Sequence, residues 1–477
     1  MSDRNRFGFK VSLRAEGLKD SINPFCKVSL LSFTGAQQRV LYRTPTAYQT
    51  DAPVWEDKVN LAVCFGETNR LKFEIYDNES AAARVIGLVE MPCGLLIRSE
   101  ESKLDIIPQG TLWVTSSIDP HGCDFLYLQL SARALKDMDV MGSNDPFYVL
   151  NVVEGGVSRQ IYKSEVLPDT PNPRWRAKTF SLEDFRGAEG DKELLIEVYD
   201  EDSLSNDFIG GKVTVLSELL APGKVLELRD KRDRPSGLLS VEAGKLTNNA
   251  DFVTRLRSGL QISLIFGVDF GKSLSKYHSE AGDNQFLQVL RSIGAGLGTY
   301  DSDQRISIYG FGGHPAGAGE ELWDLGAGEV SGVNGVLQAY QAAVASGLVF
   351  SERKSLYGLL SKVGSQLELL GKASAYFVLV LLTDGRVEDL ERCKGLLVEL
   401  SRLPLSIVLV GMGQSSPKDM AALDSDNRLL EQGGQLALRD IVQFGSFGRG
   451  VDTRASTLEV VGEVPQQVSD FYFLTRS

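Results

Sequence analysis

The sequence predicts a multidomain fold in which two antiparallel β-sandwiches are followed by a doubly wound α/β domain. First, the 477 residues exceed one ordinary core and suggest roughly three domains. Second, the first half contains an internal repeat of about 120 residues, which is the size of a domain. Third, the hydrophobic pattern then changes from short alternating runs to long apolar runs separated by helical patterns. The predicted domains are residues 1–121, 122–246 and 247–477.

The repeat consists of pairs of similar segments that keep their order and nearly their spacing. The pairs are "INPFCKVSL" (22–30) and "NDPFYVLNV" (144–152), "APVWEDKVNL" (52–61) and "NPRWRAKTFSL" (172–182), and "LKFEIYD" (71–77) and "LLIEVYD" (194–200). Each copy has short alternating runs rich in Val, Ile, Phe and Tyr between Pro, Gly, Asn and Asp, which is typical of an antiparallel β-sandwich. We expect the matching Trp55 and Trp175 to anchor the two cores.

The third domain alternates buried strands with helices. The expected strands are "LQISLIFGVDF" (260–270), "RISIYGFGG" (305–313), "AYFVLVLLTDG" (375–385) and "LSIVLVGMG" (405–413). The expected helices lie within 284–298, 333–347, 354–370 and 387–403. Near-continuous apolar strands are covered on both faces, so this alternation predicts a doubly wound α/β domain.

Charge and cysteine usage exclude several classes of protein. The net charge of −13 argues against nucleic-acid binding, and it would repel an anionic membrane unless something bridged the two. Five dispersed cysteines suggest neither a disulfide framework nor a zinc site, which favours a reducing, cytoplasmic location. The charged first residues lack a signal-peptide pattern, and apolar runs such as "YFVLVLL" (376–382) are too short to span a bilayer. We therefore expect only peripheral membrane contact.

Two loops of the second copy are acidic. They are "LKDMDVMGSNDPF" (135–147) and "YDEDSLSNDFIG" (199–210), and their candidate metal ligands are Asp139, Asp145, Asp200, Asp202 and Asp207. Loops at one end of a sandwich meet, so these carboxylates would repel one another strongly without a cation. Calcium takes six to eight oxygen ligands with tolerant geometry, whereas magnesium requires a strict octahedron. A single acidic turn would be explained by solvation, but two such loops favour a calcium site.

An EF-hand does not explain the second acidic loop. Leu204 and Ser205 lie where that motif needs a ligand and Gly, and no helices flank the loop. The first copy has lost most of its acidic residues, because Asn23 stands where the second copy has Asp145 and Arg84 replaces the last Asp. Only Asp77 and Glu79 remain, so we expect this copy to bind calcium weakly or not at all.

The DxxGxxDPF segment from Asp139 to Phe147, the NPRW segment and the YDxD that precedes DFIG resemble the calcium-binding C2 domain. The resemblance implies that the five aspartates bind calcium and that bound calcium lets the loops dock on acidic phospholipid. It also implies membrane contact for the apolar residues beside the ligands, which are Met138, Val140, Met141 and Leu204. The second loop is one residue shorter than the commonest form, which bears on the role of Asp207.

The segment "GVDFGKS" (267–273) has the ending of a phosphate-binding loop but not its spacing. Three residues rather than four separate the first Gly from the Gly-Lys pair, and Gly267 lies within a predicted strand. A P-loop-like nucleotide-binding enzyme is therefore a minor alternative. We expect no enzyme, because the three histidines, His121, His278 and His314, have loop-like surroundings and form no catalytic constellation.

Asp269 and Ser273 are expected to face Asp384 at the carboxyl edge of the parallel sheet, where α/β domains bind ligands. This arrangement resembles the metal-ion-dependent adhesion site of von Willebrand factor A domains, with a DxSxS motif, a distant Thr, and an Asp before Gly. Gly271 replaces the middle hydroxyl, and the alignment places Arg353 at the Thr position. We expect a degenerate, weak magnesium site in which the Arg353 guanidinium neutralises Asp269 and Asp384.

The order of domains, with "YFVLVLLTDG" (376–385), "LPLSIVLVGMG" (403–413), "RDIVQF" (439–444) and "EVPQQV" (463–468), resembles the copine family over nearly the whole chain. The resemblance implies a cytoplasmic adaptor that moves to plasma or vesicle membranes when calcium rises and recruits protein partners through its A-type domain. The alternative is a constitutive scaffold in which both sandwiches are structural.

Overall fold

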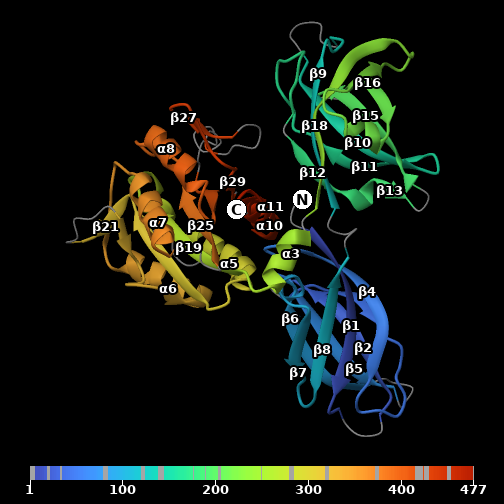
Figure 1. Ribbon diagram of the computed structural model, residues 1–477, viewed down its shortest axis with the longest axis vertical. Coiled ribbons are helices and arrows are strands. Elements are labelled where there is room, and N and C mark those ends of the chain that lie inside the picture. The colour runs from blue at the N-terminus through green and yellow to red at the C-terminus, as the bar shows by residue number, and fades with distance from the viewer. Residues whose placement is uncertain are drawn as a thin grey trace. The chain divides into compact units, whose positions relative to one another are not determined.

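The computed structural model describes most of the chain, with gaps mainly at loops and ends. The described residues are 6–18, 22–32, 35–78, 84–119, 124–137, 144–175, 177–187, 190–201, 206–248, 250–278, 284–316, 322–370, 375–413, 423, 429–447 and 453–475. The chain divides into two compact units (Figure 1), one comprising Asn5–Asp119 with Asn249–Ser477 and the other centred on Pro120–Asn248. None of the described helices is both long and apolar enough to cross a membrane.

The first sandwich consists of two four-stranded antiparallel sheets. One has the order β4 (Val54–Cys64), β1 (Arg6–Glu16), β8 (Thr111–Ile118) and β7 (Glu101–Asp105). The other has the order β3 (Gln38–Arg43), β2 (Pro24–Leu31), β5 (Arg70–Asp77) and β6 (Arg84–Pro92), and the short helix α1 (Leu95–Arg98) follows β6. Alternate residues of β1 and β5 are buried, as the period of two in their sequences predicts.

The second sandwich repeats this strand order. One half contains β12 (Lys178–Ser181), β9 (Asp124–Arg133), β18 (Pro235–Asn248) and β17 (Val225–Arg229), and the other contains β11 (Val157–Lys163), β10 (Pro146–Glu154), β15 (Glu193–Asp200) and β16 (Asp207–Thr214). The halves join at the single pair Gly211 and Arg229. The short elements are η3 (Leu182–Asp184), β13 (Arg186–Gly187), β14 (Gly190–Asp191) and α2 (Leu216–Leu219). Trp175 is fully buried in this core and Trp55 nearly so in the first, as predicted.

The third domain has a parallel sheet with the predicted alternation of strands and helices. Its order is β22 (Leu322–Asp324), β20 (Arg305–Phe311), β19 (Gln261–Asp269), β25 (Ala375–Thr383), β26 (Leu405–Gly411) and β29 (Val442–Ser446), with β22 antiparallel at one edge. β19 and β25 are adjacent, and the strands that follow each of them along the chain are added on opposite sides of this pair. The carboxyl ends of β19 and β25 therefore form the topological switch point, where such sheets bind ligands.

Helices cover both faces of this sheet. On one face, α7 (Tyr357–Leu370) and α8 (Leu390–Leu400) pack against alternate residues of β19, β25 and β26. The intervening strand residues are also buried, and α10 (Thr453–Val460) and α11 (Val464–Leu474) contact β26. The remaining helices are α3 (Ala250–Arg257), η4 (Lys272–Leu274), α4 (Ser275–His278), α5 (Gln285–Gly298) and α6 (Gly332–Ala345). The remaining strands are β21 (Gly313–Pro315), β23 (Val330–Ser331), β24 (Leu348–Phe350), β27 (Glu431–Gln432) and β28 (Gln435–Leu436).

Within the first unit, the first sandwich packs against the α/β domain. The Phe65 ring lies edge-on to Phe252 of α3, with ring centroids 5.3 Å apart, and lies 4.4 Å from the ring centroid of Tyr300. Arg257 donates hydrogen bonds to the Leu96 carbonyl (2.6 Å) and the Ser116 hydroxyl (2.8 Å). The first sandwich thus has a structural role in addition to any binding role.

Candidate functional site

Three of the five predicted calcium ligands lie together at one end of the second sandwich. Asp145 directly precedes β10, Asp200 ends β15 and Asp207 begins β16. The Asp145 backbone N–H donates to Asp200 Oδ1 (2.6 Å), and the Asp169 N–H donates to Asp145 Oδ1 (2.7 Å). Asp200 is only 1% exposed, so its carboxylate is fixed in place. Backbone donors therefore orient both carboxylates at this end of the sandwich.

The register of β15 and β16 places Asp207. It pairs directly with Asp200, after an irregularity between Val198 and Tyr199, and it is exposed. The shorter loop therefore still brings Asp207 to the strand end beside Asp200. Carboxylate oxygens are the ligands that calcium prefers, so Asp145, Asp200 and Asp207 are of the residue type that this ion requires.

The remaining residues of the predicted calcium and membrane site belong to the two acidic loops. Asp139, Asp202, Met138, Val140, Met141 and Leu204 lie outside the described residues. Within the described ranges, no group of three or more His, Cys, Asp and Glu side chains is placed to hold a metal ion. The roles of these six residues stay predictions.

The first sandwich has the same hydrogen-bonded framework with fewer carboxylates. The Asn23 N–H donates to Asp77 Oδ1 (3.1 Å), and the Gln49 N–H donates to Asn23 Oδ1 (3.0 Å). Gln49 and Asp169, the donors at matching positions, both have left-handed backbone conformations, with φ of 50° and 52°. Arg84 pairs with Asp77 across β5 and β6, where the second copy pairs Asp207 with Asp200. Thus an amide and a guanidinium occupy positions that hold carboxylates in the second copy.

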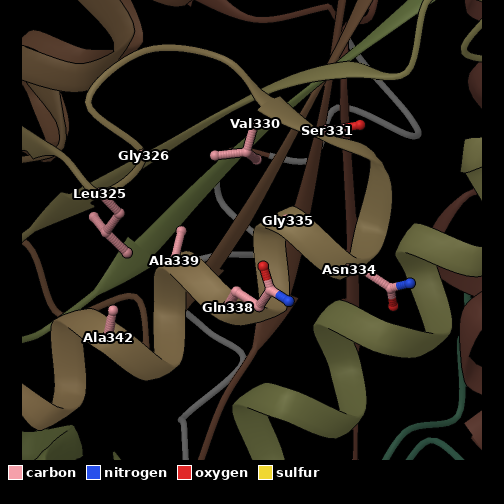
Figure 2. A pocket seen from close by; sticks show the side chains of 9 residues that line it. All are labelled: Leu325, Gly326, Val330, Ser331, Asn334, Gly335, Gln338, Ala339 and Ala342. Atoms are coloured by element: carbon pink, nitrogen blue, oxygen red, sulfur yellow. The ribbon is translucent and has the colours of Figure 1, made fainter.

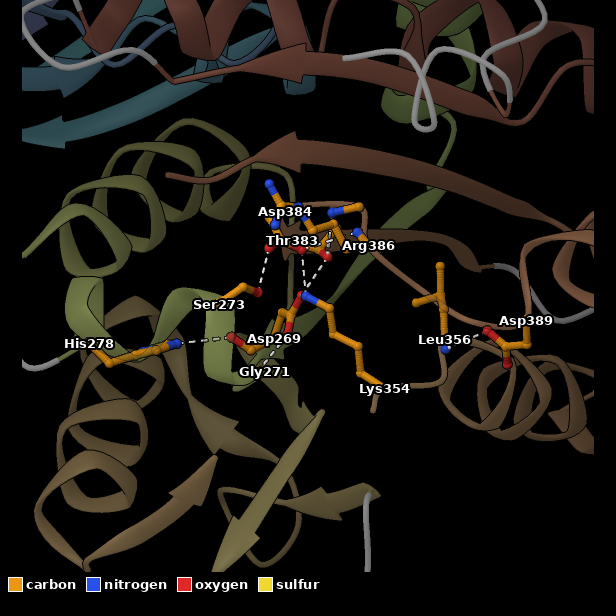
Figure 3. Close-up of polar contacts among 11 residues, drawn as sticks. Asp269, Gly271, Ser273, His278, Lys354, Leu356, Thr383, Asp384, Arg386 and Asp389 are labelled. Carbon is orange, nitrogen blue, oxygen red and sulfur yellow. Dashed lines mark hydrogen bonds and ion pairs between the residues drawn. The ribbon is translucent and has the colours of Figure 1, made fainter. Parts of the chain in front are cut away.

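The α/β domain brings Asp269, Ser273 and Asp384 together at the switch point, as the sequence predicts (Figure 3). Asp269 ends β19 and Asp384 follows β25. Ser273 of η4 donates its hydroxyl hydrogen to Asp384 Oδ2 (2.5 Å). The Thr383 hydroxyl, which the sequence analysis missed, donates to Asp269 Oδ2 (2.6 Å).

The prediction that Arg353 neutralises this site is wrong, because Lys354 does so. The Arg353 side chain is 83% exposed and forms an ion pair with Glu388 (3.7 Å). Lys354 Nζ instead lies 2.6 Å from Asp269 Oδ2 and also contacts Asp384 Oδ1, and its side chain is only 5% exposed (Figure 3). The alignment was displaced by one residue in an irregular loop. A magnesium ion does not fit between two carboxylates that already hold an ammonium group.

The two carboxylates respond differently to this environment. Burial raises the pKa of Asp269, although Lys354, the Thr383 hydroxyl and the Gly271 N–H act in the opposite direction. Burial also acts to raise the pKa of Asp384, but hydrogen bonds from Lys354 and Ser273 outweigh it and the pKa is lowered. The difference follows from the complete burial of Asp269 beneath the strand end.

His278 contacts the end of β19. The sequence predicted that it would lie in a loop, but it lies in α4. It ends α4, is 2% exposed and stacks on Phe286, with ring centroids 3.9 Å apart. Its Nε2 lies 2.9 Å from the Asp269 carbonyl oxygen, which can only accept, so this nitrogen carries the hydrogen. Burial lowers its pKa to about 4, consistent with a neutral structural residue. His314 lies in β21, and His121 lies outside the described residues.

An open cavity of about 510 Å³ lies beside α6 (Figure 2). It is lined by small, apolar and amide side chains, including Leu325, Val330, Asn334 and Gln338, and none of its lining residues is ionisable. This lining offers no acid, base or nucleophile for catalysis beyond the Ser331 hydroxyl.

Family models match the three domains. The copine family model matches residues 273–476, and the C2 domain model matches residues 11–106 and 128–230. Among solved structures, BON1-C2B is 22% identical and covers 27% of this chain and 95% of its own, with a TM-score of 0.24. The calcium-bound pair of C2 domains of Extended-Synaptotagmin 2 is 17% identical and covers 51% of this chain and 99% of its own, with a TM-score of 0.27. These TM-scores are low, so the assignment of the three domains rests on the family models.

Proposed function

Because this chain belongs to the copine family, with two tandem C2 domains followed by a von Willebrand factor A-like copine domain, we propose that it is a calcium-triggered adaptor at phospholipid membranes. The C2 and copine domains support the conclusion that this is a membrane-associated protein that binds calcium and phospholipid. In the proposal, the second C2 domain binds calcium and the A-type domain recruits protein partners.

The observation that carries this proposal is the fixed pair of carboxylates at the end of the second sandwich. Asp145 and Asp200 are joined by a 2.6 Å hydrogen bond from the backbone of one to the side chain of the other. Their positions are thus set before any ion arrives, which lowers the cost of ordering the ligands.

Charge explains why calcium would act as a switch. The net charge of −13 opposes approach to an acidic lipid surface. A bound divalent cation reverses the local charge at the loops and offers open coordination positions to lipid phosphate or carboxylate. Calcium therefore favours the membrane-bound state, as a switch requires.

Co-sedimentation with phosphatidylserine-containing vesicles tests the proposal. We expect the wild type to pellet in calcium and to stay in the supernatant with chelator. The variant Asp145→Asn with Asp200→Asn keeps the oxygen that accepts each backbone hydrogen bond but loses both charges, so it should remain in the supernatant.

Asp77→Asn, at the position of the first sandwich that matches Asp200, is the matched control and should pellet like the wild type. Equal pelleting of the double variant and the wild type would refute the assignment to the second sandwich. Pelleting that is independent of calcium in every variant would favour a constitutive scaffold.

A further inference from the structure

We propose that Lys354 is a built-in cation that closes the adhesion-site position of the α/β domain to divalent metal ions, so that any partner binding at this edge is independent of metal. The ammonium group lies between Asp269 and Asp384, at the switch point of the sheet, where a metal would have to bind.

The ammonium group of Lys354 occupies the position that a metal ion would take. Lys354 Nζ is 2.6 Å from Asp269 Oδ2, and Asp384 Oδ1 contacts it from the other strand end. Magnesium needs ligand oxygens at roughly 2.0–2.1 Å, which would place the ion against the ammonium nitrogen. The repulsion between two cations in a site this buried excludes their coexistence.

The side chain of Lys354 also fills the space beside Gly271. A Cβ atom added at Gly271 would lie 2.8 Å from Lys354 Cδ, 3.0 Å from its Nζ and 2.9 Å from Asp269 Oδ1. Gly312 has a positive φ of 70°, and a Cβ atom added there would lie 3.0 Å from Lys354 Cβ. The lysine stem therefore occupies the room that a hydroxyl-bearing side chain at position 271 would need. A hydroxyl-bearing side chain at position 271 and the observed conformation of Lys354 therefore exclude each other.

Hydrogen bonds hold the loop that carries Lys354 in place. The Ser351 carbonyl accepts a hydrogen bond from the Lys272 N–H (2.9 Å), and the Lys354 carbonyl accepts one from the Glu388 N–H (3.2 Å). On the far side, Asp389 Oδ1 accepts a hydrogen bond from the Leu356 N–H (3.3 Å, Figure 3). Asp389 also accepts hydrogen bonds from the Ser355 hydroxyl and the Tyr357 N–H. The backbone of Lys354 is thus fixed on both sides, which keeps its side chain within reach of the two carboxylates.

The remaining hydrogen bonds complete the site without a metal. Asp269 Oδ1 accepts from the Gly271 N–H (2.8 Å), and Asp384 Oδ1 accepts from the Arg386 N–H (3.1 Å). Together with the Ser273 and Thr383 hydroxyls, these donors and Lys354 satisfy a buried pair of carboxylates. A partner's carboxylate has no metal ion to coordinate here.

Manganese titration of the full chain tests the inference. The background is Asp145→Asn with Asp200→Asn, which weakens the second sandwich as a competing site. We expect no manganese bound at the α/β domain of this background. Adding Lys354→Thr and Gly271→Ser removes the ammonium and restores two hydroxyl ligands, and this variant should gain one manganese per chain, with affinity at least tenfold above the background.

Arg353→Thr in the same background is the matched control and should gain no site. A folded Lys354→Thr and Gly271→Ser variant that gains no manganese would overturn the inference, because something other than Lys354 would then exclude the metal. If that variant does not fold, anomalous diffraction from wild-type crystals soaked in manganese decides. A peak between Asp269 and Asp384 would overturn the inference, and its absence there would support it.

Discussion

Two pairs of aspartates lie at neighbouring strand ends in this chain, and their carboxylates have different partners. In the second sandwich, Asp145 and Asp200 are joined through backbone N–H groups at the ends of β10 and β15. In the α/β domain, Asp269 and Asp384 share the ammonium group of Lys354. Backbone donors orient a carboxylate but leave it charged, whereas a buried ammonium group takes the place of a metal. Two aspartates at neighbouring strand ends therefore predict calcium binding in the second sandwich and no metal binding in the α/β domain.

The largest expected effect comes from removing the built-in cation. Lys354→Met leaves Asp269 and Asp384 buried without their partner, which typically costs about 3–5 kcal/mol of folding free energy. Chemical denaturation of the full chain measures this cost. The exposed Arg353→Met should change the free energy of unfolding by less than about 1 kcal/mol. A Lys354→Met variant as stable as the wild type would show that the ion pair is unimportant.

The second prediction concerns the other pair. Calcium at 100 times its Kd should stabilise the second sandwich by about 2.7 kcal/mol, because it binds only the folded loops. Hydrogen exchange measures this locally, as slower exchange of amides in β10 and β15 with calcium than with chelator. Asp145→Asn with Asp200→Asn should abolish the difference. Equal protection in both conditions would contradict a calcium site here.

The third prediction attempts to convert the first sandwich into the second. Asn23→Asp and Arg84→Asp restore carboxylates around Asp77 on a backbone framework that is already present. In a background of Asp145→Asn with Asp200→Asn, this variant should gain a calcium-dependent stabilisation of roughly 1 kcal/mol at calcium a few times its Kd. Without calcium it should be less stable, because the carboxylates repel. If calcium has no effect on the stability of this variant, residues other than Asn23 and Arg84 determine the loss of calcium binding by the first sandwich.

The sequence predicted the fold well because its strong signals are local. Apolar runs such as 376–382 became buried strands, and the repeat gave two sandwiches with the same strand order. The pairing of Asp269 with Asp384 was also predictable, because both residues end adjacent parallel strands.

Lys354 was not predictable from the same reasoning. It lies between β24 and α7, where no periodicity fixes the register, and a displacement of one residue exchanged a buried side chain for an exposed one. Thr383 was missed because a hydroxyl at the end of an apolar strand gives no distinct signal. Asp207 could be placed only through the pairing of β15 with β16.

The smallest expected effect is a difference in stability between matching tryptophan variants of the two sandwich cores. Trp175 Nε1 donates to the Pro146 carbonyl oxygen (3.2 Å), whereas Trp55 Nε1 is buried and has no hydrogen-bond partner among the described residues. Replacing either residue by Phe removes similar apolar area, but only Trp175→Phe loses a hydrogen bond. It should therefore cost about 0.5–1.5 kcal/mol more than Trp55→Phe, measured by chemical denaturation. Equal costs would indicate that Trp55 Nε1 is satisfied in solution, by water or by a residue outside the described ranges, and that the two cores are more alike than their calcium loops.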